Sequence, residues 1–282
     1  MITMGVERVT ITVKKDILNK IDSMIDGKEL RNRSHAVENL ILKSFGKKLD
    51  TVLILAGGEG TRLRPITYEI PKPLIPIHGK PILEHQINFL KKYDIRNILL
   101  SVGYMHDKVE EYFGNGSRFD VNIDYIVEKR PLGTAGSLRL IKNYIEDSFA
   151  LLNVDTLMSP NITEMYEFHK KEDTIATILL VTVDDPSFFG VAKMRGNRIL
   201  EFVGKPSLKK APSKLVHAGF CIFEPSVINF VPKGRFMIEN LFQRLAKKGE
   251  ISGFVHDGSI FDVGTTEGYS KAIKNWKGCQ SV

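Results

Sequence analysis

Apolar residues recur at two different spacings along most of this chain, and the two spacings alternate. From residue 51 onward, short runs rich in valine, isoleucine and leucine are followed by segments in which apolar residues return every three or four positions. The short runs predict strands at 51–55, 97–102, 122–127, 149–153, 174–183 and 216–223. The helical spacing predicts helices at 81–92, 105–113, 134–145, 162–170, 236–248 and 266–277. This alternation is typical of an α/β fold around a mostly parallel, buried sheet.

The first fifty residues have a different pattern. Residues 8–13 alternate strictly, which predicts a half-buried strand whose polar face is formed by Arg8, Thr10 and Thr12. Two short amphipathic helices are predicted next: one over 16–26 that Gly27 ends, and one that Ser34 caps and Gly46 ends. These elements bury too little surface for a stable monomer of about 45 residues. The strand is therefore expected to pair with a second copy of the chain.

Composition excludes several classes of protein. Hydrophobic residues make up 43% of the 282 residues and charged residues 26%, as in ordinary globular proteins. No apolar run is long enough to predict a membrane-spanning helix, and no signal-peptide pattern opens the chain, so we expect a cytoplasmic protein. Cys221 and Cys279 have neither metal-site spacing nor the number expected of a disulfide framework. Residues 1–50 carry ten Lys and Arg against seven Asp and Glu, which permits an anionic partner there.

The most informative stretch is LAGGEGTRLRP at 55–65, with Pro-Lys-Pro at 71–73 behind it. Three glycines in such a turn leave room for another group, and its backbone N–H groups form a cup for anions. Arg62 and Lys72 add two cations, so the stretch predicts a polyphosphate site. It is not a P-loop, since no Gly-Lys-Ser or Gly-Lys-Thr ends the turn. It is not the dinucleotide fingerprint either, since Leu63 stands where the third glycine should be. The alternative is a tight turn with solvated cations.

A second candidate site lies just after the apolar run at 149–153. Asp155 follows this run, and ligands bind at the carboxyl ends of strands in sheets of this kind. Magnesium takes one or two carboxylates together with phosphate oxygens and water. Asp155 is thus a candidate Mg²⁺ ligand, and the alternative is an aspartate that only caps a helix or a turn.

These motifs carry a family resemblance. LAGGEGTRLRP followed by PKPLIPIHGKPILEHQI resembles the opening of the sugar-1-phosphate nucleotidyltransferases, which make NDP-sugars from an NTP and a sugar 1-phosphate. The resemblance implies a Rossmann-like fold with a mostly parallel mixed sheet over residues 51–282, behind a short linker at 47–50. It also implies a reaction in which a sugar 1-phosphate oxygen attacks the α-phosphorus of the NTP and pyrophosphate leaves. No general base is then required.

The resemblance also assigns roles to residues of this sequence. Asp155 and Asp262 would hold Mg²⁺, Arg62 would neutralise the pyrophosphate, and Lys72 would steady the α-phosphate. The nucleotide would be bound by Leu55, Ala56, Gly57, Gly58, Gly60, Thr61, Gly103, Gly133 and Thr134. The sugar phosphate would be bound by Gly190, Lys205 and Gly219.

Two positions depart from the family pattern. Gly204 stands where the family usually has Glu before Lys-Pro, and His217 stands where it usually has Asn before Ala-Gly. Both positions belong to the sugar side, and His217 fits an ordinary packed histidine equally well. The sugar and the nucleotide therefore stay open: GTP with mannose 1-phosphate, and dTTP or UTP with glucose 1-phosphate, are all compatible with the sequence.

The first unit has a resemblance of its own. Residues 7–46 resemble the ribbon-helix-helix DNA-binding domain, an intertwined dimer whose paired strands enter the major groove. By that likeness a domain at 1–46 would make the chain a homodimer or higher oligomer. Arg8, Thr10 and Thr12 would face the bases of double-stranded DNA, and the helix start at Ser34 would hold a phosphate. The alternatives are a dimerisation clip, or a transcription regulator whose transferase-like domain senses nucleotide or NDP-sugar.

Overall fold

The computed structural model describes residues 9–25, 27, 30–44, 49–128 and 130–278. The chain divides into two compact units, with the boundary between residues 48 and 49. Leu49 already belongs to the core of the second unit, two residues before the predicted start of the large domain. Among the described residues, none of the helices combines the length and the apolar content needed to cross a bilayer.

The first unit contains two helices, α1 (Lys15–Ser23) and α2 (Arg33–Ser44). The first helix ends at Ser23, three residues before its predicted end near residue 26, because the N–H groups of Met24 and Ile25 donate to carbonyls three residues back and form a turn. The predicted cap was also wrong. The Asn32 side chain accepts a hydrogen bond from the His35 N–H at 2.9 Å. Asn caps as well as Ser does, so α2 begins two residues earlier than predicted and Ser34 lies in its first turn.

The strand predicted over 8–13 is not formed in this single copy. Residues 9–13 adopt no hydrogen-bonded strand, and Arg8 and Gly46 lie outside the described residues. Val9 and Ile11 are 75% and 58% exposed, so the apolar face of this segment is uncovered. A strand exists only through hydrogen bonds to a neighbouring strand, and here the predicted neighbour belongs to another copy. Pairing between copies stays a prediction.

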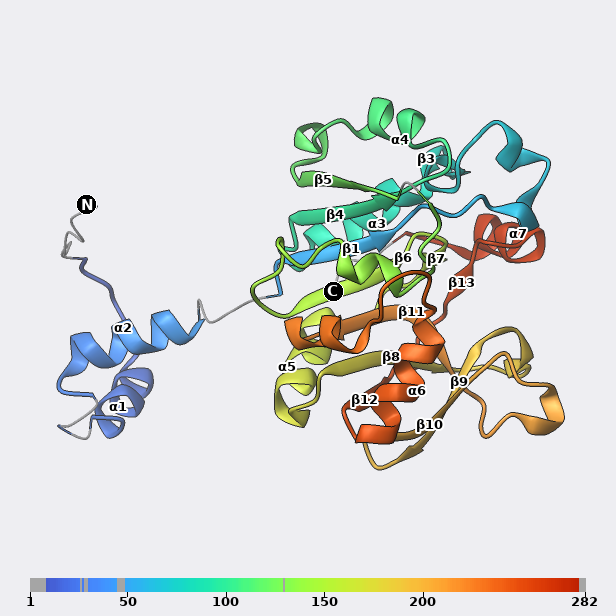
Figure 1. Ribbon diagram of the computed structural model, residues 1–282. Helices are drawn as coiled ribbons and strands as arrows, with labels where there is room; N and C mark the ends of the chain where they lie inside the picture. The colour runs from blue at the N-terminus through green and yellow to red at the C-terminus, as the bar shows by residue number, and fades with distance from the viewer. Residues whose placement is uncertain (1–8, 26, 28–29, 45–48, 129, 279–282) are drawn as a thin grey trace. The chain divides into compact units, whose positions relative to one another are not determined.

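The second unit is built on a nine-stranded sheet in the order β5-β4-β1-β6-β11-β8-β12-β10-β9 (Figure 1). Its strands are β1 (Thr51–Leu55), β4 (Asn97–Val102), β5 (Asn122–Val127), β6 (Phe149–Asn153), β8 (Ala176–Thr182), β9 (Gly190–Arg195), β10 (Arg198–Gly204), β11 (Leu215–Phe223) and β12 (Ile251–Val255). The pairings make β10 and β11 antiparallel to the other seven strands. The predicted mixed, mostly parallel sheet is therefore confirmed.

Two pairs of short strands complete the sheet structure of this unit. They are β2 (Pro76–Ile77) with β3 (Lys80–Pro81), and β7 (Thr156–Leu157) with β13 (Phe261–Asp262). The helices are α3 (Ile82–Lys91), α4 (His106–Phe113), α5 (Ile162–Glu172), α6 (Ile238–Lys248) and α7 (Thr266–Asn275).

The main sheet is buried on both faces. Val52 and Ile54 of β1 belong to a core shared with α3, α4 and α5, whereas Leu53 between them belongs to a core shared with α6 and segment 135–145. This is why the central strands read as continuous apolar runs in the sequence. A third core packs α7 against β7 and β13 through Ala272, Leu157 and Phe261.

One predicted helix was wrong. Over 134–145 the chain forms only a 3₁₀ turn at Gly136–Arg139, followed by further turns. Leu138 and Ile141 are buried, which explains the helix-like spacing. The backbone is instead tied to a distant segment, because the N–H groups of Ala135 and Gly136 both donate to the Phe236 carbonyl. The prediction also missed β9, β10 and β12.

Candidate active site

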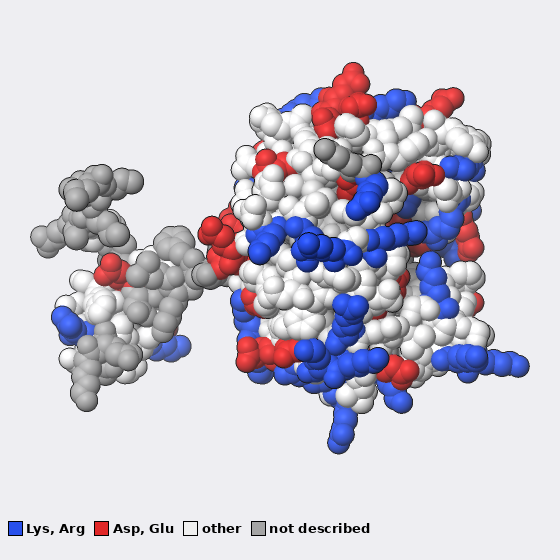
Figure 2. Space-filling model, in the orientation of Figure 1, with Lys and Arg blue, Asp and Glu red and all other residues white. Residues whose placement is uncertain are grey.

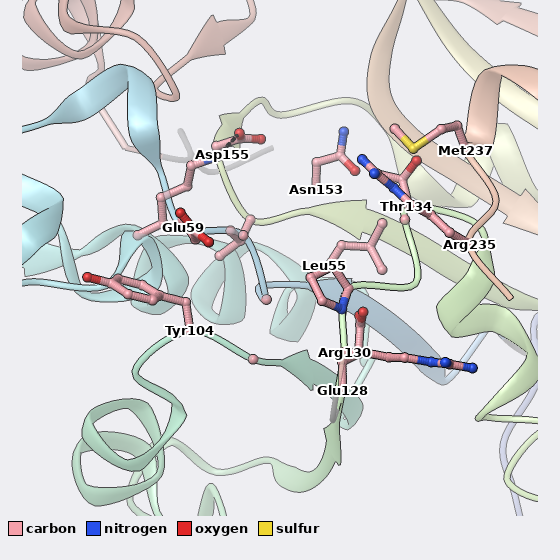
Figure 3. A pocket seen from close by; sticks show the side chains of 17 residues that line it. Leu55, Glu59, Tyr104, Glu128, Arg130, Thr134, Asn153, Asp155, Arg235 and Met237 are labelled. Carbon is pink, nitrogen blue, oxygen red and sulfur yellow. Dashed lines mark hydrogen bonds and ion pairs between the residues drawn. The ribbon is translucent and has the colours of Figure 1, made fainter.

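The candidate site lies where three parallel strands end. Leu55 at the end of β1 pairs with Ser101 of β4 on one side and with Asn153 of β6 on the other. Beside these ends lies a pocket of about 430 Å³ (Figure 3). Its lining consists of Leu55, Gly57, Gly58, Glu59, Lys72, Gly103, Tyr104, Glu128, Arg130, Pro131, Gly133, Thr134, Asn153, Val154, Asp155, Arg235 and Met237.

The first wall is formed where two glycines meet backbone to backbone. A Cβ on Gly57 would lie 3.3 Å from the Gly103 nitrogen, and a Cβ on Gly103 would lie 3.1 Å from the Gly57 oxygen. The Tyr104 N–H donates to that same oxygen at 3.4 Å. Side chains at either position would push the loops apart, so the sequence leaves bare backbone facing the pocket here.

Not every predicted residue of this loop lines the pocket. Ala56 is buried, and its N–H donates to the Ser101 carbonyl. Gly60 has φ +66°, and a Cβ there would lie 2.7 Å from Thr67 Cγ2. Thr61 is exposed at the start of a 3₁₀ turn. These three residues shape the loop rather than the pocket surface.

Four charged side chains that are far apart in the sequence come together beside the pocket. Lys72 Nζ lies 2.6 Å from Asp155 Oδ2, and an Arg62 guanidinium nitrogen lies 3.7 Å from Asp262 Oδ2. A Cβ placed on Gly264 would be 2.8–2.9 Å from atoms of Asp155, Arg62 and Asp262 at once. All three side chains therefore surround one small volume.

Backbone pairing explains how the two carboxylates meet. In the short β7–β13 pair, Asp262 lies opposite Thr156, and the Val263 N–H donates to the Asp155 carbonyl at 2.7 Å. The Gly264 N–H donates to Asp262 Oδ1 at 2.9 Å, which orients that carboxylate. The structure thus brings Arg62, Lys72, Asp155 and Asp262 into one cluster.

The two carboxyl groups have opposite pKa shifts. Burial would by itself raise the pKa of Asp155, but the Lys72 ammonium and the Arg62 guanidinium outweigh it and hold this pKa below its ordinary value. Burial and the neighbouring Asp155 charge raise the pKa of Asp262 above its ordinary value, and the Gly264 N–H and Arg62 offset this only in part. The pair therefore favours an additional positive charge.

The donor set fits magnesium that is shared with a substrate. The carboxylates of Asp155 and Asp262 face the same small volume beside Gly264. Their oxygens are the hard ligands that Mg²⁺ prefers. Within the part of the chain that the structure describes, no group of three or more His, Cys, Asp or Glu side chains is placed to hold a metal ion. Two carboxylates leave most of an octahedral shell to phosphate oxygens and water.

A buried glutamine fixes the strand end that carries Asp155. Gln86 of α3 donates from its single amide nitrogen to the carbonyls of Asn153 and Thr156, each at 2.8 Å. These two carbonyls bracket Asp155 in the sequence. The helical spacing of α3 identified Gln86 only as one position of a helix and gave no sign of this contact.

The second wall joins two segments about a hundred residues apart. The Phe236 N–H donates to the Leu132 carbonyl at 2.8 Å, and the Ile238 N–H donates to Thr134 Oγ1 at 2.9 Å. Gly133 has φ +77°, and a Cβ there would lie 2.7 Å from the Phe236 oxygen. This pairing brings Arg235 into the pocket lining, together with Met237. Sequence reasoning missed both residues, since no local motif marks them.

The residues assigned to the sugar phosphate are not part of this lining. Gly219 lies next to it, since a Cβ there would be 3.2 Å from Asn153 Nδ2. Gly190 and Lys205 lie at the end of the β9–β10 hairpin, where the Lys205 N–H donates to the Phe189 carbonyl. The structure thus places Gly219 beside the pocket and the other two on a separate hairpin.

His217 is a packed histidine in this structure. Its Nε2 lies 3.2 Å from Cys221 Sγ, and its ring meets Phe242 edge-on at 5.1 Å between centroids. Burial lowers the pKa of His217 to about 4, so the ring is neutral near pH 7. It does not line the pocket.

Charged side chains of both signs line the pocket. The chain has a net charge of +7, and Lys and Arg side chains form a row across the face of the second unit in Figure 2. The cations of the lining are Lys72, Arg130 and Arg235, and its carboxylates are Glu59, Glu128 and Asp155.

Comparisons with known proteins agree on a family. The profile described as Nucleotidyl transferase matches residues 51–277. A UTP–glucose-1-phosphate uridylyltransferase of Synechocystis is 35% identical over 240 residues, which cover 79% of this chain and 62% of that protein. The catalytic subunit beta of mannose-1-phosphate guanylyltransferase from Danio rerio is 36% identical over 219 residues, which cover 75% of this chain and 60% of that protein. The chain thus spans about three-fifths of the length of these relatives.

Solved structures give the same picture for the fold. A putative glucose-1-phosphate thymidylyltransferase from Bacillus anthracis superposes with a TM-score of 0.73 at 30% identity, covering 79% of this chain and 94% of that one. HddC from Yersinia pseudotuberculosis, solved in complex with GMP-PN, superposes with a TM-score of 0.69 at 30% identity, covering 80% of this chain and 99% of that one.

Proposed function

We propose that this chain, which belongs to the nucleotidyl transferase family, transfers a nucleotidyl group from an NTP to a sugar 1-phosphate. The products are an NDP-sugar and pyrophosphate. The observation that carries the proposal is the cluster of Lys72, Arg62, Asp155 and Asp262 beside a pocket large enough for a nucleotide.

The chemistry is mainly charge neutralisation and alignment. Two polyanions must approach each other for the sugar phosphate to attack the α-phosphorus in line. Asp155 and Asp262 would hold Mg²⁺, which when bound screens the charge of the phosphate oxygens. Lys72 would exchange its ion pair with Asp155 for one with the α-phosphate. Arg62 would likewise exchange its ion pair with Asp262 for one with the departing pyrophosphate. The attacking phosphate is already ionised, so no general base is needed.

The decisive experiment measures pyrophosphate release with Mg²⁺, an NTP mixture and a mixture of sugar 1-phosphates. We expect release only when both substrates are present. Lys72→Ala should lower the rate on the order of 100-fold, as expected for loss of one preorganised cation. Lys80→Ala is the matched control, because Lys80 pairs with Glu84 on the surface and should leave the rate unchanged. Equal rates in the two variants would remove Lys72 from the mechanism.

For the first unit, we propose dimerisation through the segment at 8–13 and contact with double-stranded DNA. The exposed Val9 and Ile11 support pairing with a second copy, because pairing would cover an apolar face that a single copy leaves in water. Thr10 and Thr12, which alternate with Val9 and Ile11 along the chain, are exposed as well. With this first unit, nucleotide-sugar synthesis and DNA binding would occur in one protein.

A mobility-shift experiment at several salt concentrations tests whether the first unit binds DNA. We expect binding that weakens steeply as salt rises, since lysine and arginine contacts to phosphates release counterions. Replacing Thr10 and Thr12 together by Ala should reduce discrimination between DNA sequences while binding to random DNA persists. Absence of any shift at low salt would leave the head as a dimerisation clip.

A further inference from the structure

The two carboxylates of the candidate metal site are held in different ways. Asp155 follows β6, a five-residue strand inside the main sheet, and Gln86 fixes the carbonyls on both sides of it. Asp262 ends β13, which has two residues and pairs with β7 in a two-stranded sheet. So short a strand makes few backbone hydrogen bonds, so side-chain packing has to decide where the Asp262 carboxylate lies.

Electrostatics makes this packing necessary. Asp155 and Asp262 face the same small volume, and two negative charges at short range repel each other. Lys72 lies 2.6 Å from Asp155, whereas Arg62 lies 3.7 Å from Asp262, so Asp262 has the weaker ion pair of the two. The repulsion therefore acts most on the carboxylate that is held less firmly.

One indole ring supplies packing at β13. Trp276 directly follows α7 and is 5% exposed. Its ring meets the ring of Phe261, the residue before Asp262, edge-on with centroids 5.9 Å apart. On its other side, the Trp276 Nε1–H donates to His85 Nδ1 at 3.4 Å, and His85 Nε2 lies 2.8 Å from the Ile77 carbonyl oxygen. The indole thus connects the residue before Asp262 to α3.

Helix α7, which lies next to β13 in Figure 1, keeps the indole in this position. The Tyr269 hydroxyl donates to the Pro76 carbonyl at 2.9 Å, and His78 Nε2 lies 2.7 Å from the Ile273 carbonyl oxygen. Both contacts join α7 to the β2–β3 hairpin. The helix is therefore tied at two places, so the indole at its end has little freedom to move.

We propose that Trp276 is a positioning residue for the metal site: through Phe261 it holds β13 against β7, so that the Asp262 carboxylate stays beside Asp155. This inference rests on the proposed Mg²⁺-dependent transfer and adds a residue that touches neither metal nor substrate. The competing explanation is that Trp276 only stabilises the core under α7. A purely structural residue changes the unfolding temperature alone, whereas a positioning residue also changes the affinity for Mg²⁺.

Calorimetric titration of the whole chain with GTP, and in parallel with UTP, at a series of Mg²⁺ concentrations tests the proposal. Trp276→Leu should need about tenfold more Mg²⁺ for half-maximal nucleotide binding, because loss of a group that orients a metal ligand typically costs about 10- to 100-fold in affinity. Trp276→Phe keeps a ring beside Phe261 and should recover most of this loss.

Phe113→Leu is the matched control. Phe113 is 2% exposed and contacts the Phe119 ring at 5.1 Å between centroids, in a different core. Its replacement should lower the unfolding temperature and leave the Mg²⁺ requirement unchanged. If Trp276→Leu likewise unfolds at a lower temperature but needs no more Mg²⁺ than the native protein, the positioning role is refuted.

Phe261→Leu tests the same contact from its other side, and it keeps the test decisive if Trp276→Leu does not fold. It should raise the Mg²⁺ requirement about as much as Trp276→Leu does. Because both substitutions remove one contact, the double variant should be no worse than either single variant. Losses that multiply in the double variant, or a native requirement in Phe261→Leu, would overturn transmission through this ring.

Failure of the transfer reaction gives a different result. If no sugar 1-phosphate supports turnover but the Mg²⁺ requirement for nucleotide binding depends on Trp276 as stated, the inference stands without the reaction. If the native protein binds neither GTP nor UTP in a Mg²⁺-dependent way, both are overturned.

Discussion

Individual residues in this protein act by holding other groups in place. Gln86 is the clearest case, because one buried amide nitrogen fixes the carbonyls on both sides of Asp155. A carboxylate that must meet a metal ion and a phosphate needs its backbone held to within a fraction of an ångström. Gln86 is therefore a positioning residue for the proposed Mg²⁺ site, although it touches no substrate group itself.

Replacing Gln86 by Met should disturb this site more than the fold. Met keeps the length of the side chain but donates to neither carbonyl, so Asp155 gains freedom. We expect kcat to fall about tenfold, as for loss of one to two hydrogen bonds, and the Mg²⁺ concentration at half-maximal rate to rise. Gln243→Met on the exposed face of α6 is the control. An unchanged Mg²⁺ requirement with a lowered unfolding temperature would show that Gln86 serves stability alone.

His217 makes stability depend on pH. Its pKa is about 4 in the folded protein against an ordinary 6.5, so protons bind preferentially to the unfolded chain as pH falls below 6.5. The stabilisation that neutral His217 provides at pH 7 is therefore lost as the pH falls from 6.5 to about 4. Between pH 7 and pH 5 this amounts to about 2 kcal/mol of unfolding free energy for one such group.

Urea unfolding at the two pH values measures this effect. The native protein should lose about 2 kcal/mol more than His217→Asn on going from pH 7 to pH 5. His169, whose pKa burial also lowers, is present in both proteins and cancels in the comparison. The same loss in both would mean that His217 is protonated equally in the folded and unfolded chains.

At the scale of elements, the pocket depends on contacts between loops. The segment at 132–136 is held by the segment that precedes α6, and Gly133 allows the two backbones to touch. Segment 134–145 reads as a helix in isolation because Leu138 and Ile141 are spaced as on a helix. Hydrogen bonds to Phe236 satisfy its backbone in another conformation, and no local pattern reports such a distant partner.

Gly133→Ala should push the segment at 132–136 away from Phe236 and so widen the pocket on this side. The left-handed φ of +77° costs about 1 kcal/mol for alanine, and the new Cβ would lie 2.7 Å from the Phe236 oxygen. Gly249→Ala carries the same backbone cost at φ +73° with nothing within 4 Å, so it is the matched control. We expect both variants to unfold at a lower temperature, but only Gly133→Ala should raise the KM for the NTP several-fold. Equal KM values would show that the wall tolerates displacement.

At the scale of the whole molecule, the chain combines two units with separate cores. The second unit has apolar cores on both faces of its sheet and a third under α7. The first has α1 and α2, tied by an Arg33–Asp22 ion pair at 2.6 Å, and an uncovered apolar segment. Self-association is therefore expected to depend on the first unit and catalysis on the second.

Removal of residues 1–48 tests this division. Pyrophosphate release by the remaining chain should stay within about twofold of the full chain, because additivity holds for independent parts. Its mass by light scattering should fall to that of a smaller assembly, and DNA binding should disappear. An unchanged number of copies in the assembly would place the oligomer contacts on the second unit instead.

The sequence by itself determined the elements whose stability is local or whose burial is complete. The strands at 51–55, 97–102 and 149–153 have the predicted bounds, because strands covered on both faces appear in the sequence as apolar runs. The edge strand at 122–127 also has its predicted bounds, although Asn122, Asp124 and Val127 are exposed. The glycine turn and Asp155 could also be predicted from the sequence, since each closely follows an apolar run.

Only the tertiary structure decided which distant groups meet. The spacing of the sequence gives no reason for Asp262 to lie beside Asp155, and only the family resemblance suggested it; the β7–β13 pairing accomplishes it. Gln86, Arg235 and Glu128 take their places through long-range hydrogen bonds and loop contacts. The strand at 8–13 is the limiting case, because its predicted partner is another copy of the chain. Periodicity reports which side of an element is buried, whereas contacts between elements depend on the path of the whole chain.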